Sequence, residues 1–135
     1  MSSAAELVGL TVTHRRYVPY SHAHYAGDLV DGAYVLGLFG DVATEMCIRT
    51  DGDEGLFASY ADVQFRAPVQ AGDVLEIDAR LARVGTRSRE LELEARVVCR
   101  ARSAEAGAPD SAATVLDLPL VVVTARGTVV VPPSR

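Results

Sequence analysis

The chain contains no lysine: all thirteen of its basic residues other than histidine are arginine. This excludes mechanisms that depend on a lysine amine, such as a Schiff base, a pyridoxal-phosphate anchor or the lysine of a P-loop. Eighteen acidic residues give a net charge of −5 and a pI of about 5.1. This acidic balance argues against nucleic acid or an anionic membrane surface as the main partner.

Cysteines, long apolar runs and nucleophile motifs are also scarce. Cys47 and Cys99 are far apart and neither has a CxxC partner, so we expect two reduced thiols in a cytoplasmic protein. The first ten residues contain no basic segment and no long apolar run, so no signal peptide is expected. The most apolar run, Leu118 to Ala125, is too short to cross a bilayer. No GxSxG motif or cysteine–histidine pairing indicates a covalent nucleophile.

The apolar content, in contrast, is high. With 135 residues and 49% hydrophobic content, the chain is predicted to form one domain over residues 1–135 with its own core. Apolar residues recur at a helical period from Leu29 to Ile48, with Asp28 or Asp31 as a possible cap and Asp51-Gly52-Asp53 at the end. The apolar band is wide, which predicts a helix of roughly 20 residues that is buried on several sides.

Strand patterns occupy much of the remaining chain. We expect strands at residues 10–18, 56–65, 74–84, 91–97 and 118–130. The segment 103–114 is rich in alanine, glycine, serine and proline, and is predicted to be a mobile loop. One long helix with about four antiparallel strands on one side of it predicts an α+β fold in which a sheet wraps around the helix. A sheet of this size exposes an edge, which pairing with a second copy would cover.

The most informative segment runs from Ser21 to Phe57 and includes the turn before the predicted helix, the helix and the loop after it. It contains two histidines and seven acidic residues but a single cation, Arg49. A soluble fold does not need so many acids in one place. We interpret the group as a site that handles a positive charge or transfers a proton.

Several segments resemble the hotdog superfamily of acyl-thioester proteins, and the match covers most of the chain. Residues 63–73, VQFRAPVQAGD, resemble its strand–turn–strand signature. Residues 84–89, VGTRSR, resemble its next hairpin, which is often near the coenzyme A arm. Residues 23–33, 38–45 and 51–57 are similar to the branch of 3-aminobutyryl-CoA and β-alanyl-CoA ammonia-lyases.

The resemblance implies a hotdog fold, a thioester substrate carried by coenzyme A or by a carrier protein, and reversible loss of ammonia from a 3-aminoacyl thioester. It implies no cofactor beyond the coenzyme A of the substrate, and a homodimer or larger homo-oligomer. Two rival functions stay open. One is a hotdog thioesterase, alone or after addition of an amine to an enoyl thioester; the other is a non-catalytic module that binds acyl thioesters. The many carboxylates disfavour the binding module, because a protein that holds acyl chains gains nothing from burying acids.

Loss of ammonia needs a base for the α-proton, hydrogen-bond donors for the enolate oxygen and a place for the ammonium group. Asp41, Glu45 and His24 are the candidates for base, ammonium ligand and proton transfer, in no fixed order. Asp41 and Glu45 are four residues apart on one helical face, so something should compensate their repulsion. Arg49 could do so for Glu45 as a structural salt bridge, and His24 could equally be a packed or loop-bonding histidine.

The candidates for substrate binding precede the helix. Backbone N–H groups around Gly27, Asp28 and Leu29 could form an oxyanion hole at the N-terminus of the helix, where a glycine lets the carbonyl approach. Asp28 and Asp31 could bind substrate too, although such residues are more often caps.

Further candidates lie outside the helix start. Tyr25 could line the pocket and Glu54 could close it. Arg83, Arg87 and Arg89 flank a predicted tight turn, where they could bind the phosphates of coenzyme A or simply be solvated.

No metal site is expected. His22 and His24 form an HxH pair, but no third ligand follows at a known spacing. The segment 51–55, DGDEG, lacks the later glycine and distant glutamate of a calcium loop.

Overall fold

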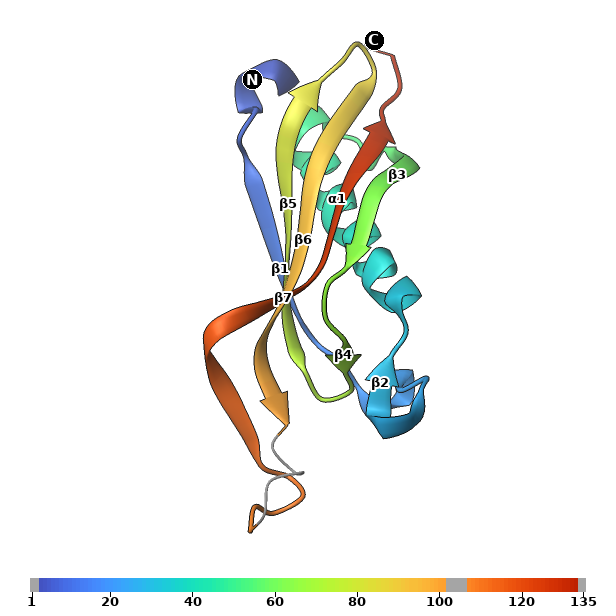
Figure 1. Cartoon of the computed structure of the whole chain (residues 1–135). Coiled ribbons are helices and arrows are strands. Elements are labelled where there is room, and N and C mark those ends of the chain that lie inside the picture. The colour runs from blue at the N-terminus through green and yellow to red at the C-terminus, as the bar shows by residue number, and fades with distance from the viewer. Residues whose placement is uncertain (1–2, 102–106, 134–135) are drawn as a thin grey trace.

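One long helix, α1 (Gly32–Asp51), lies against the inner face of a twisted antiparallel sheet in the computed structural model (Figure 1). The structure describes residues 3–101 and 107–133. The sheet has five strands in the order β1-β5-β6-β7-β3, and a two-stranded pair joins β2 to β4. The α+β architecture expected of a hotdog fold, a sheet wrapped around one helix, is therefore confirmed.

The elements follow one another with short connections. The strands are β1 (Thr11–Tyr17), β2 (Leu29–Val30), β3 (Leu56–Phe65), β4 (Val69–Gln70), β5 (Val74–Val84), β6 (Ser88–Ala101) and β7 (Ala113–Val130). Three short 3-10 helices are η1 (Ala4–Leu7), η2 (Tyr20–His22) and η3 (Ala26–Asp28).

The core forms where the apolar face of α1 meets the sheet. The buried helical residues recur at the spacing of one face: Val35, Leu38, Phe39, Val42, Ala43, Met46, Cys47 and Thr50. In the strands that face the helix every second residue is buried, as the two-residue period of a strand requires. These residues are Leu75, Ile77, Ala79 and Leu81 in β5, and Leu91, Leu93, Ala95 and Val97 in β6. Burial also raises the pKa of the Cys47 thiol to about 11, so this cysteine stays protonated near neutral pH.

The rest of the α1 surface is open to solvent in the single chain. Residues exposed there are Ala33, Gly37, Asp41, Thr44 and Ile48. The sheet covers only one side of the helix, so burial on several sides, as predicted from the width of the apolar band, is not found within one chain.

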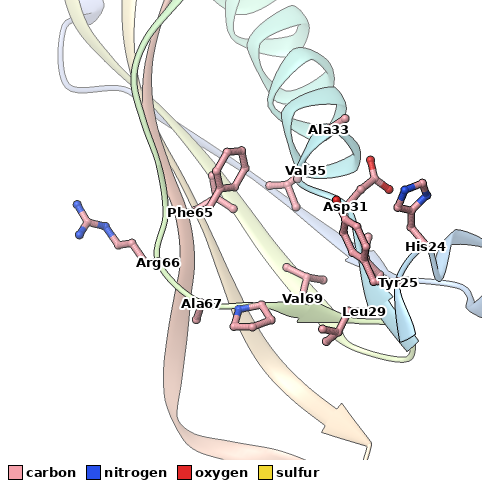
Figure 2. Close-up of a pocket in the computed structure, with 14 residues that line it drawn as sticks. His24, Tyr25, Leu29, Asp31, Ala33, Val35, Phe65, Arg66, Ala67 and Val69 are labelled. Carbon is pink, nitrogen blue, oxygen red and sulfur yellow. The ribbon is translucent and has the colours of Figure 1, made fainter. Parts of the chain in front are cut away.

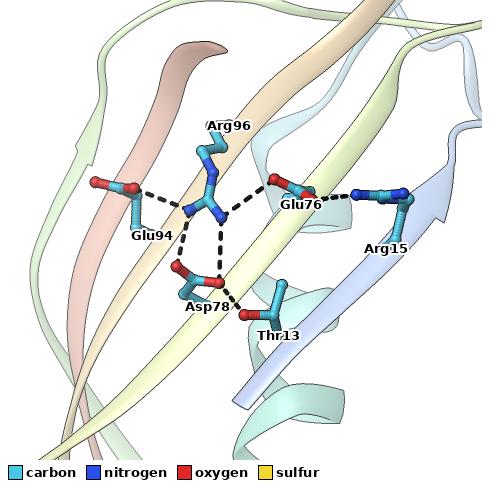
Figure 3. Close-up of polar contacts among 6 residues, drawn as sticks. All are labelled: Thr13, Arg15, Glu76, Asp78, Glu94 and Arg96. Carbon is cyan, nitrogen blue, oxygen red and sulfur yellow. Dashed lines mark hydrogen bonds and ion pairs between the residues drawn. The ribbon is translucent and has the colours of Figure 1, made fainter. Parts of the chain in front are cut away.

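The outer face of the sheet carries an ion-pair network centred on Arg96 of β6 (Figure 3). Its Nη1 atom is 2.8 Å from Asp78 Oδ2 and 3.2 Å from Glu94 Oε2, and its Nη2 atom is 3.3 Å from Glu76 Oε1. Arg15 of β1 binds the same Glu76. Carboxylates and guanidinium groups thus alternate across three neighbouring strands, which stabilises their register and keeps this face polar.

The helix begins later than predicted. Gly27 and Asp28 have left-handed φ angles of 72° and 61°, so the chain turns there and cannot start a right-handed helix. Leu29 and Val30 then pair with β4, and α1 starts after Asp31, so Asp28 is not its cap. At the other end Gly52 is left-handed and donates its N–H to Ile48 O at 2.9 Å, which confirms the predicted stop.

The strand predictions are largely confirmed. Strands at 56–65 and 74–84 match β3 and β5, and those at 10–18, 91–97 and 118–130 lie at β1, β6 and β7 with shifted ends. Of the predicted loop 103–114, residues 103–106 lie outside the described residues, 107–112 connect the strands, and β7 has begun by 113. The sheet has five strands rather than about four, and β2 and β4, with two residues each, were too short to predict.

The two edges of the sheet are β1 and β3. The β3 edge is irregular, because its pairing with β7 shifts between Phe57 and Ser59 and again between Ala61 and Gln64. Such bulges are common at sheet edges and limit unspecific pairing. Across residues 3–101 and 107–133, no helix has the length and apolar character needed to cross a membrane.

Arg89 locks the C-terminal end of α1 to the turn between β5 and β6. Its guanidinium binds Asp51 at two points, Nε to Oδ2 at 2.9 Å and Nη2 to Oδ1 at 2.7 Å. Its Nη1 donates to the carbonyl oxygens of Gly85 and Ser88. The Arg89 side chain is only 7% exposed, and its hydrogen bonds hold the pKa of Asp51 below the usual value.

Arg89→Ala is expected to lower the free energy of unfolding by about 3 kcal/mol, because it leaves the largely buried Asp51 carboxylate without its partner. The exposed Arg83→Ala is the matched control, and should change it by less than about 1 kcal/mol. Urea unfolding would measure both. Because the folded pKa of Asp51 is depressed, this stabilisation is present above its unfolded pKa and is lost as pH falls through the folded value. A difference between Arg89→Ala and wild type that is unchanged in strong acid would contradict this account.

Candidate active site

A cavity of about 750 Å³ lies beside the N-terminal end of α1 (Figure 2). One wall comes from residues 24–35 and the other from the end of β3, the β3–β4 connection and β7. The complete lining is His24, Tyr25, Leu29, Val30, Asp31, Gly32, Ala33, Val35, Phe65, Arg66, Ala67, Pro68, Val69 and Val123. Most of these residues are apolar, with a few polar groups at fixed places, as in sites for small organic ligands.

Backbone hydrogen bonds hold the loop that carries His24 and Tyr25. The N–H groups of both residues donate to Leu29 O, at 2.8 and 2.9 Å. This closure depends on the left-handed turn at Gly27 and Asp28. The loop then continues into β2, whose pairing with β4 places the two aromatic side chains beside the start of α1.

Asp31 occupies the N-cap position of α1 but does not act as a cap. In the described chain its carboxylate makes no capping hydrogen bond, and it lines the cavity together with His24 (Figure 2). The first N–H groups of a helix have no partner within the helix. Those of Gly32 and Ala33 therefore remain beside the cavity, in a region of partial positive charge that favours an anion.

The predicted oxyanion hole is displaced along the chain. Gly27 and Asp28 precede α1 and line a neighbouring cavity of about 560 Å³ with Tyr20, Gln70, Ala71, Ala101 and Asp110. The helix N-terminus was expected near Leu29, but it lies at Gly32 because β2 intervenes. A role for Gly27 and Asp28 in substrate binding stays a prediction, whereas Tyr25 and Asp31 do line the main cavity.

Asp41 and Glu45 contact residues of β1 and do not line this cavity of the described chain, so their catalytic role stays a prediction. Glu45 Oε2 accepts a hydrogen bond from Arg49 Nε at 2.7 Å. Its other oxygen, Oε1, pairs with His14 Nε2 at 2.8 Å. The Arg49 bond and then the His14 bond lower the pKa of Glu45. Asp41 is exposed and lies 3.5 Å from Arg16. The predicted salt bridge to Arg49 is thus present, and two residues of β1 that the helical pattern could not reveal supply the remaining partners.

The comparisons with known proteins agree with this fold. Residues 29–107 match the family model described as the Thioesterase superfamily. The chain is also 51% identical over 113 residues to the 3-aminobutyryl-CoA ammonia lyase of Acetoanaerobium sticklandii, covering 84% of this chain and 87% of that protein. This chain belongs to the thioesterase superfamily. Within this hotdog superfamily, the resemblance to the ammonia-lyase branch is confirmed.

Solved structures support the same assignment. The β-alanyl-CoA:ammonia lyase of Clostridium propionicum has a TM-score of 0.84 and 35% identity, with 92% of this chain and 86% of that chain covered. A hexameric hotdog-fold thioesterase of Campylobacter jejuni has a TM-score of 0.69 at 17% identity, with 87% and 79% covered. The second likeness shows the hotdog fold alone.

The remaining predicted residues lie at the other end of this hotdog domain. Glu54 is exposed just after the C-terminus of α1, and Arg83 and Arg87 lie at the turn between β5 and β6. Arg87 donates to Val131 O at 3.0 Å, and Arg89 is committed to Asp51. None of them lines the cavity of the same described chain, so their part in binding coenzyme A or substrate stays a prediction.

No group of three or more histidine, cysteine, aspartate or glutamate side chains within residues 3–101 and 107–133 is arranged to hold a metal ion. The two imidazoles of the HxH pair have separate aromatic neighbours. His22 lies 4.3 Å from the Tyr34 ring, and His24 meets the Tyr25 ring edge-on at 4.6 Å, between centroids.

Phe65, Arg66 and Val123 line the cavity, but the sequence did not single them out. Phe65 and Arg66 lie inside the hotdog strand–turn–strand signature, which was interpreted only as a fold marker. Backbone bonds from Arg66 N and Ala67 N to Val122 O bring this segment to β7 and so to the cavity. The position of this signature, between the end of one strand and the start of the next, was the sequence signal that could have identified them.

Proposed function

We propose that this hotdog protein is a 3-aminoacyl-CoA ammonia-lyase, which interconverts a short 3-aminoacyl-CoA with the 2-enoyl-CoA and ammonia. The observation that carries the proposal is that three kinds of group meet at one cavity: the carboxylate of Asp31, which makes no capping bond, the imidazole of His24, and the first residues of α1, Gly32 and Ala33. The relatives named as ammonia lyases match almost the whole chain and support the same reaction.

The helix N-terminus would bind the thioester carbonyl. Its oxygen accepts hydrogen bonds from the N–H groups of Gly32 and Ala33, which stabilise the negative charge of the enolate. The partial positive charge of the helix end acts in the same direction. No cofactor is needed beyond the coenzyme A of the substrate, because the carbonyl itself accepts the electrons.

Asp31 would act as the base in this mechanism. Its carboxylate takes the proton from the carbon next to the carbonyl, and the electron pair is held as the enolate. It then forms the C2–C3 double bond as the C3–N bond breaks. The substrate's ammonium group leaves as ammonia, with the electrons of the broken bond on nitrogen. The proton on Asp31 then returns to ammonia through His24, which gives ammonium and restores the carboxylate.

Arg66 is the one cation among the described residues that line the cavity. Its Nε atom donates to Thr124 Oγ1 of β7 at 3.0 Å, and its guanidinium points away from the other side chains of the cavity (Figure 2). Arginine binds phosphate groups at two points. Arg66 is therefore proposed to contact a phosphate of coenzyme A; recognition of a carrier protein instead of coenzyme A stays a prediction, as does a cytoplasmic location.

A homo-oligomer would complete the site. One end of the β3 edge, at Phe65, lies at the cavity, and the other end is at Leu56. Leu56 pairs with Val130 of β7, and Val130 pairs in turn with Ser88 of β6. In a twofold antiparallel pairing of two β3 edges, these ends exchange places. The arginine turn 83–89 of the second copy would then lie towards this cavity, which would give those arginines the predicted role.

A thioesterase is the rival function, and it fits the superfamily as well. In that reaction the same carboxylate would activate a water molecule against the thioester carbonyl. A non-catalytic binding module would hold the thioester without changing it. The three alternatives differ in products.

Incubation of crotonyl-CoA with the protein and ammonium is expected to give an adduct heavier by the mass of ammonia, without release of free thiol. Mass spectrometry would identify the adduct, and a thiol reagent in a parallel tube would detect coenzyme A. Free coenzyme A without the adduct would establish the thioesterase instead. If neither the adduct nor free coenzyme A appears, both reactions are refuted for this substrate.

Asp31→Asn is expected to lower kcat/KM for ammonia addition by about a hundredfold or more, because the base is lost. Its melting temperature should change little, since the carboxylate makes no capping bond. Asp117→Asn, at an exposed position of β7 outside the cavity, is the matched control and should retain activity within about threefold. Loss of activity in Asp41→Asn with activity kept in Asp31→Asn would move the base to the helix face beside β1.

A further inference from the structure

The ring of Phe65 lies directly against the first residue of α1. Phe65 ends β3, and a Cβ atom placed on Gly32 would be 2.3 Å from Cε1 and 2.7 Å from Cζ of this ring. Atoms do not approach so closely, so any side chain at residue 32 must displace the ring. Figure 2 shows the ring beside Val35 at the cavity wall.

Backbone geometry does not explain the glycine at residue 32. Gly32 lacks the left-handed φ angle that Gly27 and Gly52 adopt, and it is the first residue of a regular helix, where alanine is well tolerated. The three heavy atoms nearest to such a Cβ atom all belong to the Phe65 ring. The pair therefore acts as one unit, in which a missing side chain makes room for a ring.

The ring is less firmly held than the buried valines of the cavity wall. Phe65 is 59% exposed, whereas Val35, Val69 and Val123 are almost completely buried. The valines are thus fixed by the core, whereas a substitution or a ligand can move the ring. The polar groups of His24 and Asp31 lie across the cavity at the loop side (Figure 2).

We infer that the Phe65 ring, seated on Gly32, is the wall that limits the length of acyl chain this protein accepts. This rests on the proposed function, because it takes the occupant to be an acyl-CoA. With the thioester carbonyl at the N–H groups of Gly32 and Ala33, the next carbons of the acyl chain face Val35 and Phe65. In this arrangement a butyryl chain would end near the ring, and the two further methylene groups of a hexanoyl chain would have to displace it. Phe65 is therefore a specificity-determining residue.

Binding of saturated butyryl-CoA and hexanoyl-CoA tests the wall without any turnover. Titration calorimetry should show tighter binding of butyryl-CoA by wild type. In Phe65→Ala the ratio of the two dissociation constants should shift by about tenfold or more towards hexanoyl-CoA, because two further methylene groups gain apolar contact. Phe65→Leu should shift the ratio less, in the same direction. Leu118→Ala, which truncates an exposed side chain of β7, should leave the ratio unchanged.

A second variant tests the contact with Gly32. Gly32→Ala should push the ring into the cavity and weaken binding of both esters by about tenfold. Gly32→Ala combined with Phe65→Ala should bind like Phe65→Ala alone, since the clash is gone. A combined variant as weak as Gly32→Ala, or an unchanged ratio in folded Phe65→Ala and Phe65→Leu, overturns the inference.

The outcomes separate this inference from the proposed function. Saturated acyl chains carry no 3-amino group and no double bond, so they report on the wall alone. A shifted ratio in a protein that fails to add ammonia to crotonyl-CoA refutes the lyase and keeps the wall. Ammonia addition with an unchanged ratio keeps the lyase and refutes the role of Phe65 in chain-length selection. Absence of binding of either ester also refutes that role.

Discussion

Phe39 and Met46 of α1 are completely buried against the sheet, where Leu75 and Ile77 are buried as well. Each such side chain contributes about 1.5–3 kcal/mol by leaving water. A helix of 20 residues is a stiff rod about 30 Å long, so fixing one face fixes both ends. The rest of the structure depends on this contact, because it determines where the N-terminal and C-terminal ends of α1 meet the sheet (Figure 1).

The two ends of α1 differ in how their unpaired backbone groups are satisfied. The C-terminal end is closed by the glycine cap at residue 52 and by the pair between Asp51 and Arg89. The N-terminal end is left open, since Asp31 does not cap it and the first N–H groups lie beside a cavity. Unsatisfied donors are costly when buried and useful when a ligand binds them. A departure from good helix capping thus coincides with the place where we expect chemistry.

The sequence predicted regular elements well where one period extends over many residues. The strands 56–65 and 74–84 were predicted at their observed ends, because alternation and flanking turns agree. The start of α1 was missed because Leu29 and Val30 continue the apolar period, although they belong to β2. Strands of two residues are defined by their partner, here Val69 and Gln70 in β4, and have no period of their own.

The sequence by itself determined the family, the α+β fold, the absence of lysine chemistry and the presence of acids near the N-terminal half of one helix. Only the tertiary structure decided which acids face the cavity. Helical spacing shows that Asp41 and Glu45 share a face, but the rotation of α1 on the sheet turns this face towards Arg16 and His14 of β1. Asp31 faces the cavity because the chain leaves β2 there, and such a placement depends on contacts between residues far apart in the sequence.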